Sequence, residues 1–391
     1  MNSRIKPAER VNDLAVYYLQ KKLDEVARMN AEGRDVISLG IGGPDGSAPS
    51  AAIDAMSVSA HRSDTHSYQQ GIGLLSLREA FAAWYADNYG VELNPHSMIL
   101  PLIGSKEGIL HISLAFLNPG DKVLVPNPGY PTYTAVARII GATPVYYSLQ
   151  EEKGWYPDFE ELEASDLSGV KMMWINYPHM PTGAPATRAL FEKVIEFGKK
   201  HGILIVHDNP YSFILNKEPM SLLSIPGALD VALEMNSLSK SHNMAGWRIG
   251  MVAGSEQHIS WIRKIKSNID SGQFRPVMEG AVKALQQPKD WYDALYDMYA
   301  ARRLAGEAVM DALGCTFNPN QRGMFLWGRV PENIANVEDF CNRILNEARV
   351  FITPGFIFGT NGERYIRISL CATAEKLNEA TKRIKAINYK I

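Results

Sequence analysis

The chain has 391 residues, of which 46% are apolar and 21% are charged, and its formal net charge is -2. This length exceeds what a single hydrophobic core usually serves, so we expect two domains. The near balance of 40 basic and 42 acidic residues excludes a nucleic-acid or membrane-surface partner that is attracted by bulk charge.

The cysteines and the N-terminus indicate a protein of the reducing cytosol. Cys315, Cys341 and Cys371 have no Cys-x-x-Cys spacing, so we expect free thiols and neither a disulfide framework nor a zinc site. The segment Met1 to Arg10 is polar and lacks the apolar core of a signal peptide. No apolar run approaches the roughly 18 residues that span a membrane, so we expect a cytoplasmic protein without a membrane partner.

The N-terminal region combines an arm, a helix and a glycine-rich turn. Apolar residues at helical spacing predict an amphipathic helix from about Leu14 to Met29. A short strand, Val36 to Leu39, then leads into a turn that contains Gly42 and Gly43. Two interpretations stay open for these glycines: they let backbone amides approach a ligand closely, or they serve only the turn.

Seven short apolar runs follow, several of them before a helical pattern. This alternation predicts an α/β domain with a seven-stranded, mostly parallel sheet. Ligands of such sheets lie beyond the carboxyl ends of the strands, so the loops after the runs form the candidate site. The runs are residues 98–103, 122–126, 143–148, 170–175, 203–207, 231–236 and 249–253.

Three of these loops carry residues that suit a planar, phosphorylated ligand. Gly104 to Ile109 opens a helix whose free N–H groups attract phosphate, although Lys106 is equally compatible with simple exposure. Tyr130 lies between prolines, so its restrained ring either faces a planar ligand or packs in the core. Asp208, with Tyr211 three residues later, is either a helix N-cap or the partner of a buried cationic nitrogen.

The stretch from Asn236 to Gly254 carries the most specific pattern. It places Lys240 close to Ser237 and Ser239, with Arg248 eight positions later. A fixed cation and partial desolvation both lower the pKa of an amine, which favours the unprotonated form that imine chemistry needs. Two hydroxyls and a guanidinium are also suitable phosphate ligands. The alternative is a polar loop with a solvated lysine.

The region after about residue 280 predicts a smaller α+β domain that the N-terminal arm completes. Helical stretches, about 289–313 and 337–349, alternate there with strand candidates. Arg367 lies within one of these strands and either faces solvent or holds an anion. The strand candidates are Met324 to Arg329, Val350 to Ile352 and Arg364 to Leu370. The expected divisions are residues 1–45 for the arm, 46–280 for the large domain and 281–391 for the small domain.

Together these segments resemble a class I/II aminotransferase of the fold type I pyridoxal-phosphate (PLP) enzymes. The resemblance runs from Leu39 to Leu370 and is most specific at Ser237 to Lys240 with Gly246 to Gly250. Gly104 to Ile109 and Asn268 to Gly272 look closest to the branch with alanine, aspartate and LL-diaminopimelate aminotransferases. Further support comes from Pro128 to Tyr133, Asp208 with Tyr211, Tyr68 with Gly71, and Ile366 to Ser369.

The resemblance implies a role for single residues around the cofactor. Lys240 would hold PLP as an imine and carry the proton between the substrate Cα and the cofactor. Asp208 would keep the pyridine nitrogen protonated, which preserves the electron sink of the ring. Tyr211 would hydrogen-bond the cofactor O3′, and Tyr130 would stack on the ring.

The resemblance also implies how phosphate, substrate and partner subunit are bound. Tyr68 would reach the phosphate of the partner subunit, so a homodimer with shared active sites is expected. Arg367 would clamp the substrate α-carboxylate with help from the Gly42 amide. The implied phosphate ligands are the backbone amides of Ser105 and Lys106, the hydroxyls of Ser237 and Ser239, and the guanidinium of Arg248.

The implied activity is the exchange of an amino group between an L-amino acid and a 2-oxo acid in two half-reactions. Because a fold does not define a reaction, two alternatives stay open. One is a PLP-dependent lyase or decarboxylase on the same fold. The other, more remote, is a non-catalytic PLP-binding regulator.

One position departs from the family pattern. Met180 stands where the family usually has the asparagine of Asn-Pro-Thr-Gly, which ordinarily bonds O3′, and methionine has no donor for that bond. Either Tyr211 bonds this oxygen alone, or Asn176 or His179 reaches it from the same turn.

Overall fold

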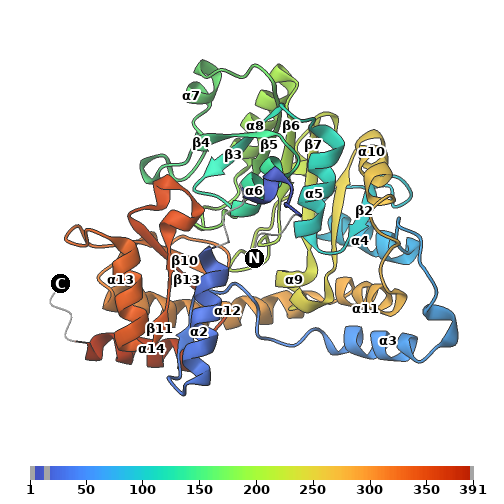
Figure 1. Ribbon diagram of the computed structural model, residues 1–391. Coiled ribbons are helices and arrows are strands. Elements are labelled where there is room, and N and C mark those ends of the chain that lie inside the picture. The colour runs from blue at the N-terminus through green and yellow to red at the C-terminus, as the bar shows by residue number, and fades with distance from the viewer. Residues whose placement is uncertain (1–4, 13–17, 388–391) are drawn as a thin grey trace.

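The computed structural model describes residues 5–12 and 18–387 and has a seven-stranded sheet at its centre (Figure 1). The strand order is β2-β8-β7-β6-β5-β3-β4, and β8 alone runs antiparallel to its neighbours. Each predicted apolar run forms one strand, so the predicted sheet is confirmed. The strands are β2 (Ile99–Leu102), β3 (Lys122–Asn127), β4 (Thr143–Ser148), β5 (Val170–Ile175), β6 (Leu204–Asp208), β7 (Ala232–Ser237) and β8 (Gly250–Gly254).

Helices cover both faces of this sheet. Val123 and Val125 of β3 belong to one core cluster and Leu124 to the other, as the pleat requires. Coverage on both sides explains why the strands are continuous apolar runs. One cluster contains α5 (Ser105–Phe116), α6 (Pro131–Ile139) and α10 (Glu256–Lys266), and the other contains α4 (Leu75–Tyr89), α8 (Arg188–His201) and α11 (Arg275–Leu285).

Local capping chemistry sets the helix ends. α8 begins after Thr187, whose Oγ1 accepts the Leu190 N–H at 3.1 Å, and it ends at Gly202, with a φ of 63°. α5 begins after Gly104, and no described side chain caps its first N–H groups. These donors stay available to a ligand beyond the carboxyl end of β2.

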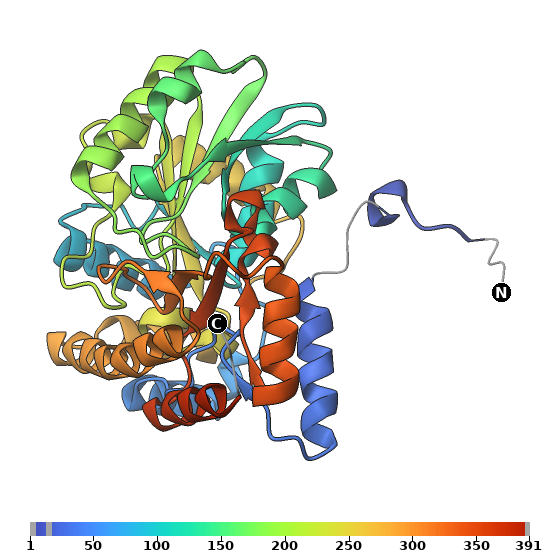
Figure 2. The ribbon, with the colours of Figure 1, turned by 90° about the vertical axis from the view of Figure 1, so that its left-hand side faces the viewer.

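The C-terminal region forms a smaller α+β unit together with residues from the start of the chain. Ile37 pairs with Val350, so β1 (Ile37–Ser38) runs parallel to β11 (Val350–Phe351). Figure 2 shows α2 beside α13, and the Lys22 Nζ donates to Asn342 Oδ1 at 2.7 Å. The second sheet has the antiparallel order β12 (Thr353–Pro354), β13 (Tyr365–Ser369), β10 (Phe325–Arg329) and β9 (Thr316–Phe317). The helices here are α2 (Tyr18–Ala31), α12 (Lys289–Ala312), α13 (Val337–Arg343) and α14 (Ala374–Ala386).

Some boundaries differ from the predictions. The expected start of the first helix, at Leu14, lies outside the described residues. The predicted helix 337–349 is α-helical to Arg343 and continues as a π-helix over Ile344–Ala348. Thr353 directly follows the strand candidate Val350 to Ile352 and belongs to a separate strand, β12. The division into three segments at residues 45 and 280 stays a prediction. The remaining helices are α1 (Glu9–Asn12), α3 (Ser50–Ala60), α7 (Phe159–Ala164) and α9 (Leu238–Ser241).

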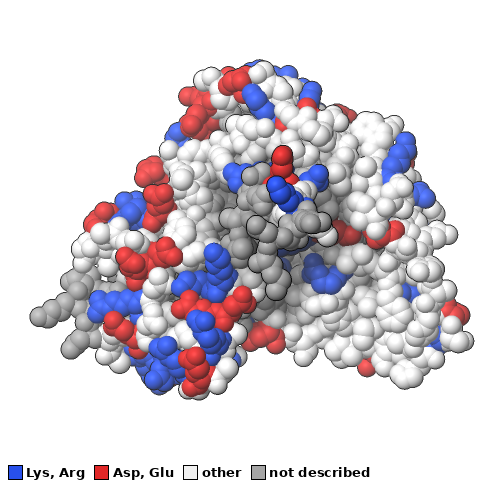
Figure 3. Space-filling model, in the orientation of Figure 1, with Lys and Arg blue, Asp and Glu red and all other residues white. Residues whose placement is uncertain are grey.

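The face drawn in Figure 3 carries charges of both signs. Basic and acidic side chains are intermixed there, most densely over the region of α2, α13 and α14. Within the described ranges, no helix combines the length and the apolar character that crossing a membrane requires.

Candidate active site

Lys240 lies in the short helix α9, directly after the carboxyl end of β7. Ser237 caps this helix, since its Oγ accepts a backbone N–H of the first turn at 3.2 Å. The Lys240 Nζ donates to the carbonyl of Gly42, which comes from the N-terminal segment. Burial lowers the pKa of Lys240, and the cations Arg367 and Arg248 lower it further. Lys240 is therefore an enclosed amine and not a solvated loop residue.

Asp208 ends β6, lines the same cavity and has one carboxylate oxygen without a partner among the described residues. Its Oδ2 accepts a hydrogen bond from the Tyr133 hydroxyl at 2.9 Å, and its buried Oδ1 has no partner among the described residues. Burial raises the pKa of Asp208 to about 6, while the Tyr133 bond, His207 and Lys240 act in the opposite direction. Turns rather than a helix follow Asp208, so the N-cap interpretation is wrong. The unpartnered oxygen suits a cationic N–H donor.

Tyr133 is a site residue that the sequence analysis did not single out. Its fully buried ring stacks on Trp174 with 4.8 Å between centroids and 6° between planes. Tyr130, which lines the cavity, lies edge-on to Tyr133 at 5.5 Å. The spacing of three residues between Tyr130 and Tyr133 could have identified Tyr133 from the sequence, because residues three apart at the start of a helix share one face.

Tyr211 and Asn176 reach the cavity from the loops after β6 and β5. Burial raises the pKa of the Tyr211 phenol. The Asn176 Nδ2 donates to the Asp208 carbonyl, and its Oδ1 accepts the Met180 N–H at 2.8 Å. The amide of Asn176 thus ties the two loops together. His179 is buried but is not among the described residues that line the cavity.

The groups expected to hold a phosphate come from α5, α9 and the segment before β8. Ser105 and Lys106 open α5, where the backbone N–H groups are uncapped. Arg248 has a φ of 57°, a conformation that is unusual for a non-glycine residue. Gly104 leaves room for it, because a Cβ there would lie 2.0 Å from the Arg248 Nη2. The remaining donors are the hydroxyls of Ser237 and Ser239.

Arg367 lies on β13 and is only 5% exposed, so the solvated-face interpretation is wrong. Its guanidinium lies 4.0 Å from the ring centroid of Phe325 and 4.6 Å from that of Phe358. The Nη2 donates to the Gly40 carbonyl at 2.8 Å, and the Nη1 lies 3.3 Å from the Met180 Sδ. An apolar frame of this kind holds the charge in place and strengthens its attraction for a carboxylate.

These side chains line one cavity of about 330 Å³. All predicted site residues except Tyr68 are among its lining residues. Tyr68 is 92% exposed and lies outside the cavity of its own subunit. The lining residues that the sequence analysis did not assign to the site are Leu19, Tyr133, Met180, Pro210, Ala245, Phe325 and Phe358.

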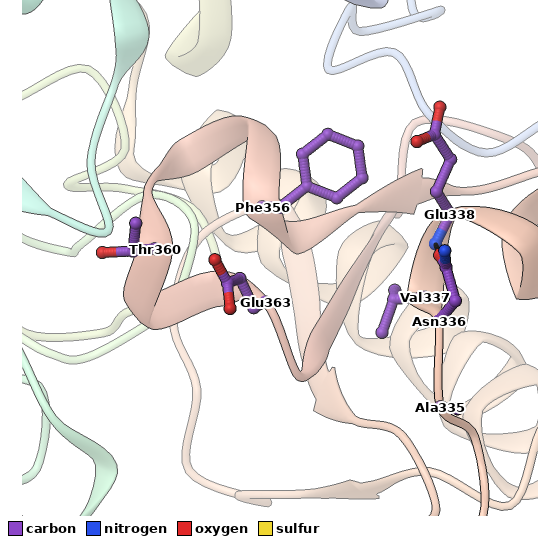
Figure 4. A pocket seen from close by; sticks show the side chains of 7 residues that line it. All are labelled: Ala335, Asn336, Val337, Glu338, Phe356, Thr360 and Glu363. Carbon is purple, nitrogen blue, oxygen red and sulfur yellow. Dashed lines mark hydrogen bonds between the residues drawn. The ribbon is translucent and has the colours of Figure 1, made fainter.

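A second hollow, of about 420 Å³, lies beside the start of α13 (Figure 4). The titratable groups among the described residues that line it are the carboxylates of Glu338 and Glu363. No lysine, histidine or cysteine occurs in that described lining, whereas the larger set around Lys240 contains two amines, an acid and two guanidiniums. The chemistry therefore belongs to the Lys240 cavity.

The sequence profile of the family described as aminotransferase class I and II matches residues 34–384. The chain belongs to the class I and II aminotransferases. An LL-diaminopimelate aminotransferase from Oleidesulfovibrio alaskensis is 41% identical over 374 residues, which cover 95% of this aminotransferase and 96% of the relative. One from Aquifex aeolicus is 39% identical over 371 residues, which cover 94% and 96%.

Solved structures agree with this assignment. Substrate-bound BacF from Bacillus subtilis has a TM-score of 0.94 and 32% identity, with 99% of this aminotransferase and 98% of that chain covered. An aromatic aminotransferase from Pyrococcus horikoshii has a TM-score of 0.87 and 28% identity, with 97% of both chains covered. The predicted family, the fold and the activity are confirmed: the protein exchanges an amino group between an amino acid and a 2-oxo acid.

Class I and II aminotransferases depend on PLP, and the described residues of this aminotransferase fit that cofactor. The unpartnered Oδ1 of Asp208 suits a pyridine N–H. Lys240 offers an amine of lowered pKa to an aldehyde. The uncapped start of α5 and the Arg248 guanidinium suit a phosphate.

Proposed function

We propose that this aminotransferase binds PLP in the Lys240 cavity and transfers the amino group between LL-diaminopimelate and a 2-oxo acid. The observation that supports the cofactor most directly is that Lys240 lines one cavity with Asp208, whose buried Oδ1 has no partner among the described residues. The choice of donor is supported by the relatives of 41% and 39% identity that are named LL-diaminopimelate aminotransferase.

Different cavity residues would bind different parts of the cofactor. When bound, PLP supplies an aldehyde that accepts the amino group and an electron-withdrawing ring. Asp208 would hold the pyridine nitrogen in its protonated form, Tyr211 would donate to O3′, and Tyr130 would face the ring. Asn176 would keep the two loops beside O3′ in place, because its side-chain amide hydrogen-bonds the backbone of Asp208 and of Met180. The proposed phosphate ligands are Ser105, Lys106, Ser237, Ser239 and Arg248.

Lys240 would carry out two tasks. Its amine attaches the cofactor, and, once released, it moves the proton at the substrate Cα. Because burial lowers its pKa, the amine is unprotonated for more of the time, so a larger fraction of it is available as a base near neutral pH.

Arg367 would hold the α-carboxylate that every amino acid and 2-oxo acid substrate shares. The Gly42 amide would add a second donor to the same carboxylate. The rings of Phe325 and Phe358 pack against the guanidinium, and this apolar surrounding strengthens the ion pair with the substrate.

We also propose a cytoplasmic homodimer in which Tyr68 completes the phosphate site of the partner. Tyr68 projects from its own subunit, and the apolar side chains of Ile269 and Phe274 are exposed as well. The two loops adjoin, because a Cβ at Gly272 would lie 2.8 Å from the Gln69 carbonyl oxygen. The three cysteines are free and buried, which suits a reducing compartment.

A screen of donors against acceptors tests this function. LL-diaminopimelate, L-aspartate and L-phenylalanine are each paired with 2-oxoglutarate and with pyruvate, while L-glutamate is paired with pyruvate alone and L-alanine with 2-oxoglutarate alone, because their other pairings give no net reaction. We expect the highest kcat/KM with LL-diaminopimelate and 2-oxoglutarate. Release of ammonia, without amino transfer to either acceptor, would instead support a lyase and contradict the proposal.

A donor with an uncharged side chain is the second candidate. The apolar frame of Arg367, formed by Met180, Phe325 and Phe358, favours it. In that case L-phenylalanine exceeds LL-diaminopimelate in kcat/KM in the same screen.

A further inference from the structure

The segment from Leu39 to Asp45 forms one wall of the Lys240 cavity. The Leu39 carbonyl accepts the Ser369 N–H at 2.7 Å, so the segment starts along the end of β13. The Gly40 carbonyl accepts from the Arg367 Nη2 at 2.8 Å. The wall thus begins as an extension of the strand that carries Arg367.

Apart from the hydrogen bond that the Gly42 carbonyl accepts from the Lys240 Nζ, the middle of this wall has few contacts that hold it in place. Gly42 and Gly43 have no side chains, and Ile41 is 44% exposed. Gly42 packs closely on Phe325, since a Cβ there would lie 2.3 Å from the ring Cζ. The position of Gly42 therefore depends on how the two ends of the segment are fixed.

Arg302 fixes the far end. It lies on α12 and is 8% exposed. Its Nη1 donates to the Asp45 Oδ1 at 2.7 Å and its Nη2 to the Asp45 Oδ2 at 3.2 Å, which is the two-pronged geometry of a strong arginine–carboxylate pair. The Nη1 also donates to the Leu370 carbonyl at 3.3 Å. One guanidinium thus joins the end of the wall to the residue that follows β13.

We propose that Arg302 is a positioning residue for substrate binding: through Asp45 and Leu370 it holds the Gly42 wall in register with Arg367. The proposal rests on the proposed function of Arg367 and Gly42 as the α-carboxylate site. Both ends of the wall are tied to β13, so Gly42 and Arg367 keep a fixed separation. Two donors at a fixed separation bind a carboxylate without a reorganisation cost.

The two half-reactions would depend on Arg302 equally, because both substrates present an α-carboxylate. A loss of binding that the ground state and the transition state share raises KM and leaves kcat nearly unchanged. PLP binding would not depend on Arg302, since its proposed ligands lie outside both α12 and the segment from Leu39 to Asp45. This pattern separates positioning from a general loss of stability.

The test compares three variants of the pair with a matched control. Arg302→Met removes the charge and keeps much of the apolar stem, Arg302→Lys keeps the charge without the fork, and Asp45→Asn spares the bond to Leu370. The control is Arg383→Met, because Arg383 Nη2 also binds an aspartate of the N-terminal segment, the Oδ2 of Asp35, at 2.6 Å, but on the far side of β1.

Steady-state kinetics are measured with LL-diaminopimelate and L-alanine as donors and 2-oxoglutarate as acceptor, together with the Kd for PLP and the thermal midpoint. We expect Arg302→Met and Asp45→Asn to raise KM about tenfold for donor and acceptor alike, with kcat and the PLP Kd within about twofold of the parent. Arg302→Lys recovers part of the loss. Arg383→Met leaves KM unchanged.

Three results would overturn the proposal: an unchanged KM in Arg302→Met and Asp45→Asn, a PLP Kd that rises in step with KM, or an equal effect of Arg383→Met. Arg367→Lys separates this inference from the function on which it rests. If Arg367→Lys raises KM and Arg302→Met does not, only the role of Arg302 fails. If Arg367→Lys leaves KM unchanged, the proposed carboxylate site itself fails.

Discussion

Tyr133→Phe removes the hydroxyl that donates to Asp208 and retains the ring that stacks on Trp174. A hydrogen bond to a charged group contributes about 1.5–3 kcal/mol, which corresponds to a pKa change of about 1–2 units. The pKa of Asp208 is about 6 with the bond in place. Without it, we expect a pKa of roughly 7–8, so that much of the carboxylate is protonated at neutral pH.

The assay is the Kd of the apoenzyme for PLP between about pH 5 and 9, read from cofactor absorbance. Only the ionised form of Asp208 can pair with a protonated pyridine nitrogen, so affinity falls as pH drops through the pKa of Asp208. In Tyr133→Phe this loss should begin about 1–2 pH units higher than in the parent.

Tyr147→Phe is the matched control, because the Tyr147 hydroxyl is also buried and donates to the Trp174 carbonyl at 2.8 Å. It removes a buried tyrosine hydroxyl beside the same tryptophan without touching Asp208. An identical pH profile for the two variants would refute the role of Tyr133.

Three further changes have defined outcomes. Arg248→Gln should raise the PLP Kd by about tenfold or more, measured by absorbance titration, because it removes a charged phosphate ligand; an unchanged Kd would contradict this. Gly42→Ala should lower kcat/KM, since the added Cβ would lie 2.3 Å from the Phe325 Cζ. Full activity of this variant would contradict the role of the Gly42 segment in substrate binding. Burial raises the pKa of Asp208 from 3.8 to about 6, so protonated Asp208 favours the folded apoenzyme below about pH 4 and this contribution is lost as pH rises through 6. Urea unfolding should therefore show the parent apoenzyme losing about 3 kcal/mol relative to Asp208→Asn between pH 4 and 7, and parallel curves would contradict the shift.

The large sheet could be predicted because its strands are buried on both faces and separated by amphipathic helices. The same burial is the reason why the sequence analysis left two interpretations of Arg367 open. Alternation identifies a solvated face only if one face is solvated, and every residue of β13 is buried. The alternation of residues in this strand therefore could not show whether the Arg367 side chain faces solvent or binds an anion.

The remaining misses depend on contacts between distant segments. Phe325 and Phe358 follow an ordinary strand and turn pattern, and only the tertiary fold brings their rings against the Arg367 guanidinium. β12 has two residues and exists because Thr353 pairs with Arg367 across the sheet. Tyr133, in contrast, was predictable, because it lies three residues after Tyr130 in the sequence, at the start of α6.

The covalent attachment of the cofactor to Lys240 is the central claim, and borohydride reduction of the holoenzyme followed by peptide mapping tests it most directly. Reduction fixes the cofactor on the lysine that holds it. We expect the label on the peptide that contains Lys240 and no label in Lys240→Ala. A label on a different lysine, or an unlabelled protein, would contradict the assignment of this cavity as the active site.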